Sequence, residues 1–112
     1  MVDNKLFPSF PTPVILYNFN KESHDLNISL VNDILKEKNS DTEGRVASNM
    51  GGWHSTLKME DRYDSFQTLR DRIEECSNDF CRQTGHKDGL IVERLWANIS
   101  GPGDINMPHH HG

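Results

Sequence analysis

The spacing of apolar residues predicts a first helix between Asp25 and about Lys38. Ile28, Val31 and Leu35 recur at intervals of three and four residues, which is the spacing of one face of an α-helix. Two further apolar residues, Leu30 and Ile34, flank them. Asp25 belongs to the residue types that cap helix N-termini. We therefore expect a helix that starts at this aspartate.

A longer apolar stripe predicts a second helix. Its members again step by three and four residues: Phe66, Leu69, Ile73, Cys76 and Phe80. Asp64 and Gln67 form a capping pattern before the stripe, and Gly85 supplies a stop after it. We expect this stripe to be the face that packs on a sheet.

The flanking segments predict strands. Residues 6–19 contain three prolines and then the β-favouring run 14–17, so we expect an extended segment followed by an edge strand. Residues 90–100 are rich in branched and aromatic side chains that would face both sides, as in an interior strand. A turn is expected at residues 101–104, where glycine and proline alternate before an aspartate.

The polar stretch over residues 40–62 predicts a loop with one short strand. Its glycine pair at 51–52 predicts a tight turn that carries Trp53 to the core, because no lysine follows to make a phosphate-binding loop. His54 and Ser55 are adjacent, and adjacent strand residues face opposite ways. A serine hydrolase is therefore not expected.

Composition predicts one domain, residues 1–112, with a thin core. Leu, Ile, Val and Phe make up 26 of the 112 residues, about 23%, which is only slightly above the ~20% below which highly charged chains are disordered. The predicted elements make the fold class α+β. A folded but marginal domain is the expectation.

Charge and cysteine content exclude several classes of function. The net charge of −5 and the lack of a basic run argue against a nucleic acid partner. No apolar run is long enough to cross a membrane, and the N-terminus does not resemble a signal peptide. Cys76 and Cys81 point in different directions on a helix and cannot pair with each other there. A reducing, cytoplasmic setting is expected.

The C-terminal histidines are the one cluster with metal-ligand chemistry. His109 and His111 are two residues apart, so on a strand both face the same side and can hold one ion, whereas His110 faces away. Three interpretations remain: a frayed tail, the remnant of an engineered tag, or a metal site. A tag is disfavoured because the run has only three consecutive histidines and because Met107 and Pro108 continue smoothly from the turn.

Residues 95–111, LWANISGPGDINMPHHH, resemble a family of 2-oxoglutarate and Fe(II) dependent oxygenases. That family combines a Trp-containing strand, a Pro/Gly-Asp turn and a Pro-His-x-His motif. Three earlier segments agree with the resemblance: LFP at 6–8, TPV at 12–14 and GGWHS at 51–55. The resemblance thus covers essentially the whole chain in order.

The resemblance implies the N-terminal portion of a double-stranded β-helix (jelly-roll) fold, with two helices packed on a β-sheet. It also implies Fe(II) and 2-oxoglutarate as cofactors, His109 and His111 as metal ligands, and Trp96 and Asn98 as pocket-lining residues. The reaction would be hydroxylation of an unknown substrate, a small molecule or a protein. His111 stands where the family usually has Asp or Glu. The distal histidine and the 2-oxoglutarate-binding residue are expected beyond Gly112, in an incomplete domain.

Two other functions remain open at this stage. The chain can be a non-catalytic binding or assembly module that forms a homo-oligomer through an open sheet edge. Alternatively, His109 and His111 from two chains can build a four-histidine structural zinc site.

Overall fold

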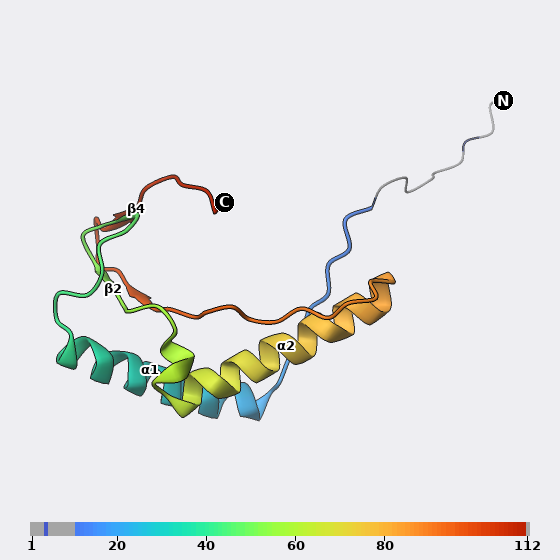
Figure 1. Ribbon diagram of the computed structural model, residues 1–112, viewed down its shortest axis with the longest axis horizontal. Helices are drawn as coiled ribbons and strands as arrows, with labels where there is room; N and C mark the ends of the chain where they lie inside the picture. The colour runs from blue at the N-terminus through green and yellow to red at the C-terminus, as the bar shows by residue number, and fades with distance from the viewer. Residues whose placement is uncertain (1–3, 5–10, 112) are drawn as a thin grey trace.

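The computed structural model describes residue 4 and residues 11–111. In chain order its elements are α1 (Lys21–Ser40), β1 (Asn49–Met50), β2 (Trp53–His54), the 3₁₀ helix η1 (Met59–Asp61), α2 (Asp64–Thr84), β3 (Asn98–Ile99) and β4 (Ile105–Asn106). The two helices lie against each other, and the short strands lie together beyond one end of the pair (Figure 1). In the part of the chain described here, neither helix has the apolar length needed to span a bilayer.

Helix α1 begins at Lys21, four residues before the predicted start at Asp25. Asn20 precedes it with a φ of 53°, and its backbone N–H donates to the Asn18 side chain (2.8 Å). The turn at these two asparagines therefore sets the helix start, and Asp25 lies within the first two turns.

The stripe that predicted α1 is not its buried face. Ile28, Val31 and Leu35 are 51%, 54% and 49% exposed, whereas Leu30 and Ile34 pack against the core. Helix α1 is thus apolar on two sides. The side that packs against α2 and the strands is the one that also carries the buried Glu37. The existence of the helix followed from the spacing, but its orientation did not.

Helix α2 agrees closely with its prediction. Gly85 ends it in a left-handed conformation with a φ of 82°, and its N–H donates to the carbonyl of Cys81, so the predicted stop is confirmed. The predicted cap is wrong, because Asp64 is the first helical residue and makes no capping bond. Instead, the carbonyl of Tyr63 accepts hydrogen bonds from the N–H groups of Phe66 and Gln67.

The prediction of a jelly-roll portion with two helices packed on a β-sheet is wrong. The strands form two separate two-stranded antiparallel ladders, β1 with β4 and β2 with β3. The helices pack mainly on each other and on η1 rather than on a sheet. Pairing is short because Gly51 and Gly52 have φ values of 71° and 66° and the turn at 101–104 interrupts the opposite segment.

Two strand predictions also fail. Residues 14–17 are not paired into a strand, and the extended segment expected at 6–10 lies outside the described residues. The predicted interior strand at 90–100 is reduced to β3, and Ile91 is 85% exposed. Its middle is held by other partners, since the N–H of Leu95 donates to the carboxylate of Glu60 (3.0 Å to Oε2).

The core is thin, as the composition predicts. Its buried cluster is small and joins β2, η1, α2 and the segment before β3: Trp53, Met59, Phe66 and Ala97. The predicted turn at the glycine pair is confirmed, because both glycines have positive φ and the tryptophan that follows is 4% exposed. This core fixes one end of the helix pair against the strands.

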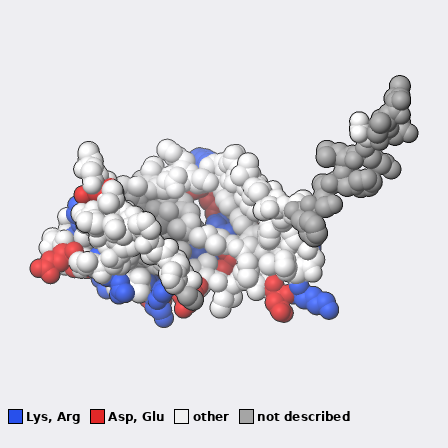
Figure 2. All heavy atoms as spheres, turned by 90° about the horizontal axis from the view of Figure 1, so that it is seen from above, with Lys and Arg blue, Asp and Glu red and all other residues white. Residues whose placement is uncertain are grey.

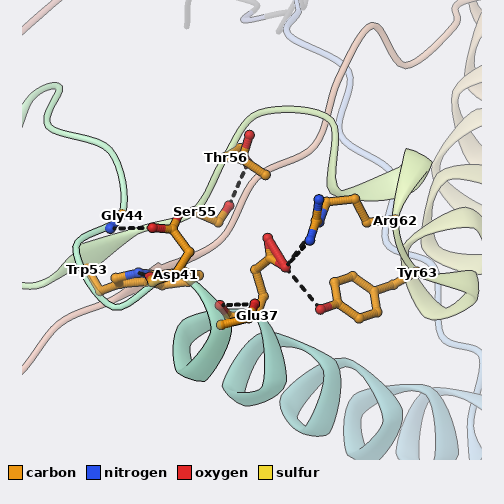
Figure 3. A network of polar contacts seen from close by, with 9 residues as sticks. Glu37, Asp41, Gly44, Trp53, Ser55, Thr56, Arg62 and Tyr63 are labelled. Atoms are coloured by element: carbon orange, nitrogen blue, oxygen red, sulfur yellow. Dashed lines mark hydrogen bonds and ion pairs between the residues drawn. The ribbon is translucent and has the colours of Figure 1, made fainter.

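A buried polar network anchors the same region (Figure 3). The Glu37 carboxylate on α1 is 2% exposed and accepts hydrogen bonds from Arg62 Nε (3.0 Å) and the Tyr63 hydroxyl (3.0 Å). Burial raises the pKa of the Tyr63 hydroxyl, and the hydrogen bond to the carboxylate raises it further. Nearby, Trp53 Nε1 donates to the carbonyl of Asp41 (2.8 Å). The network ties the end of α1 both to the start of α2 and to β2.

Candidate functional site

A pocket of about 340 Å³ lies beside the two strand ladders. Its walls come from the loop before β1, from β2, from the segment that leads into β3, and from β4 with the C-terminal segment. The lining residues are Arg45, Ala47, Ser48, His54, Leu57, Arg94, Trp96, Asn98, Asn106, His109 and His111. This volume is at the small end of the ~300–1,000 Å³ range of ligand pockets.

The four site residues predicted from the sequence all line this pocket: His109, His111, Trp96 and Asn98. Strand register places Asn98 there, because it pairs with His54 across the β2–β3 ladder. The turn at 101–104 then returns the chain alongside β1, and the N–H of Met107 donates to the carbonyl of Ser48 (2.6 Å). The histidine segment is thereby held next to the tryptophan.

The rings of His109 and His111 form an edge-to-face contact, and their centroids are as far apart as those of two imidazoles on one ion. Two imidazoles bound at metal–nitrogen distances of about 2.1 Å with ligand angles of about 90–110° have ring centroids roughly 4.5–5.2 Å apart. The two rings are 5.0 Å apart here. His109 Nδ1 lies 2.8 Å from the carbonyl of Met107. A carbonyl only accepts hydrogen bonds, so in the neutral ring Nε2 is the nitrogen available to a metal.

His54 is a pocket residue that the sequence reasoning did not select. It is 6% exposed, and its ring stacks on Trp96 with centroids 5.8 Å apart and planes 13° apart. His54 Nδ1 donates to the carbonyl of Ser55 (2.6 Å). The only sequence signal for it was the GGWHS segment, which is part of the resemblance noted above. The Trp96 ring centroid also lies 6.3 Å from that of His111.

Among the described residues, neither the serine beside this pocket nor the two cysteines elsewhere in the chain forms a further nucleophilic or metal-binding arrangement. Over residue 4 and residues 11–111, no three His, Cys, Asp or Glu side chains are placed to hold a metal ion together. The Ser55 hydroxyl donates to the carbonyl of Thr56 and accepts from the N–H of Ala97, so His54 does not act on it. Cys76 and Cys81 are free thiols, and burial raises the pKa of Cys76, which disfavours its thiolate.

The charged residues of the pocket are both basic. Arg45 and Arg94 line it, and its described lining contains no Asp or Glu, although the chain carries a net charge of −5. The Arg94 guanidinium carbon lies 6.0 Å from the ring centroid of Trp96. On the face shown in Figure 2, charged side chains gather mainly along one long edge. No sequence pattern indicates this local excess of positive charge, because the two arginines lie far apart along the chain.

No family model matches this chain, and no similar protein was found among curated proteins or solved structures. A function must therefore be inferred from the residues of the pocket.

Proposed function

We propose that this pocket is the metal site of an Fe(II) and 2-oxoglutarate dependent dioxygenase that hydroxylates a small molecule or a protein. The observation that carries the proposal is the convergence of His109 and His111, with rings 5.0 Å apart, in a pocket also lined by Trp96 and Asn98. The resemblance of residues 95–111 to that oxygenase family supplies the reaction class.

The residues present can supply two of the ligands of such an iron. Imidazole is a preferred ligand of Fe(II), and the hydrogen bond from His109 to the carbonyl of Met107 orients the first ring. The described residues provide no carboxylate in the pocket to complete the usual set of two histidines and one carboxylate. When bound, Fe(II) with 2-oxoglutarate and dioxygen supplies the oxidative chemistry.

The remaining pocket residues orient and shield a substrate. Trp96 presents a ring that is 36% exposed, so it offers an apolar surface to a ligand while its contact with His54 holds it in place. The Asn98 and Asn106 side chains can donate and accept hydrogen bonds at the same cavity. We place the protein in the cytoplasm, where free Cys76 and Cys81 stay reduced.

Metal binding tests the proposal directly. We expect Co(II), added anaerobically in place of Fe(II), to bind at about one equivalent and to give the visible absorption of a nitrogen-ligated ion. Loss of an outer partner of a metal ligand costs about 10–100-fold in affinity. His109→Ala and His111→Ala, which remove ligands, are therefore each expected to weaken binding at least tenfold.

His110→Ala is the matched control, because His110 does not line the pocket. It is expected to bind Co(II) like the wild type. Equal binding by all four proteins would show that the histidine pair is not a metal site. Binding of Fe(II) without histidine-dependent formation of succinate from 2-oxoglutarate would keep the metal site and exclude the dioxygenase.

A further inference from the structure

The arginines of this chain divide into two groups. Four of the six make an ion pair with a carboxylate: Arg62, Arg70, Arg72 and Arg82. The other two, Arg45 and Arg94, have no carboxylate partner among the residues that the structure describes, and both line the pocket of the histidine pair. In an acidic protein, the two arginines without a carboxylate partner among the described residues thus line the same cavity, and both are solvent-exposed.

Two guanidinium groups in one cavity repel each other and also repel a metal dication. Such repulsion is stronger in a partly enclosed pocket than in bulk water, because the surrounding protein lowers the effective dielectric constant. An anion between them removes this cost. Guanidinium groups also present paired N–H donors that match the oxygens of carboxylate and phosphate.

We propose that the pocket binds a small anionic ligand, one that bears a carboxylate or phosphate group, through Arg45 and Arg94. This proposal names the class of ligand at the proposed iron site, so its biological meaning rests on the proposed function. The binding of the anion itself requires no metal. The volume of about 340 Å³ limits the ligand to a small molecule. Trp96 provides an apolar wall, and Asn98 provides further hydrogen bonds.

Tryptophan fluorescence gives a direct readout, because an anion held by Arg94 changes the field at the adjacent Trp96 ring. The chain is titrated in EDTA, without metal, with sodium succinate, with inorganic phosphate and with uncharged succinamide. We expect a saturable response to succinate or phosphate and none to succinamide. Hydrogen bonds to charged groups contribute enough that Arg45→Gln and Arg94→Gln should each weaken binding by about tenfold or more.

Arg70→Gln is the control, since Arg70 pairs with its neighbour Asp71 on α2 and does not line the pocket. Trp96→Phe should abolish the fluorescence response and so assign it to this pocket. The tighter of the two anions identifies the carboxylate or the phosphate as the preferred group. Absence of a saturable response, or equal affinity in wild type and both pocket variants, would overturn the proposal.

The result is independent of the metal titration. Anion binding without any Co(II) binding would support the anion site and would exclude the proposed iron-dependent function. Co(II) binding without anion binding does the reverse.

Discussion

Replacing Arg62 by methionine should destabilise the protein by about 2 kcal/mol, because it leaves the other charge of the pair, a buried carboxylate, without its cationic partner. The cost is below that of a fully buried pair, since the Arg62 side chain is 52% exposed. Glu37 is that other charge: it is 2% exposed, and Arg62 Nη2 lies 2.9 Å from its Oε1. The Tyr63 hydroxyl would be its one remaining side-chain donor among the described residues. Domains of this size have total stabilities of about 5–15 kcal/mol, so urea unfolding followed by circular dichroism should show a clear loss.

The double variant Arg62→Met with Glu37→Met separates this explanation from simple loss of contacts. Replacing both members of a buried pair by apolar residues is often neutral. We therefore expect the double variant to recover most of the stability that Arg62→Met loses. A double variant less stable than the single one would mean that the pair itself, rather than the isolated charge, stabilises this region.

Gly52→Ala should destabilise the β2–β3 ladder next to the pocket. Gly52 has a φ of 66°, and a Cβ there would lie 2.8 Å from the carbonyl oxygen of Ile99, a backbone atom of β3. The left-handed conformation alone costs about 1–2 kcal/mol for an alanine. The contact with β3 adds to this, because β2 and β3 must separate. Thermal unfolding should show a loss of stability greater than this conformational cost of about 1–2 kcal/mol.

Gly103→Ala is the matched control. Gly103 also has a positive φ, 84°, but a Cβ there would meet nothing within 4 Å. The Gly103→Ala variant should be destabilised only by about 1–2 kcal/mol, which is the cost of the left-handed conformation. Equal stability of the two variants would show that close approach to Ile99 does not matter.

The helices followed from the sequence because apolar periodicity is a local property. The start of α1 was misplaced, since it depends on a hydrogen bond between Asn18 and Asn20 rather than on the residue type at Asp25. Its buried face could not be assigned from the spacing, because α1 is apolar on two sides. Which side becomes buried depends on the packing of α2 and the position of Glu37, and neither is encoded in α1 alone.

The strands were overpredicted because β-favouring composition does not ensure a pairing partner. The backbone of Leu95 bonds to the Glu60 carboxylate and to the N–H of Met59, so the segment is extended without belonging to a sheet. The jelly-roll expectation came from the resemblance and not from the residues themselves. It failed because each ladder extends over only two residues per strand.

The pocket was predicted in part. One continuous stretch of chain contains four of its residues, so the motif and the turn together were enough to predict that they lie close to each other: His109, His111, Trp96 and Asn98. Arg45, Arg94 and His54 come from segments that meet the stretch only through the β2–β3 register and the loop before β1. His54 was set aside as a partner for Ser55, and its stacking on the tryptophan is a tertiary contact that no local pattern shows.

X-ray absorption at the iron edge tests the central claim most directly. The chain is loaded with one equivalent of Fe(II) under anaerobic conditions, and the scattering pattern of imidazole rings around the metal is counted. We expect two imidazoles in the wild type and in His110→Ala, and one in His109→Ala or His111→Ala. A spectrum with no imidazole, or one that is the same in all four proteins, would contradict the assignment of His109 and His111 as a shared metal site.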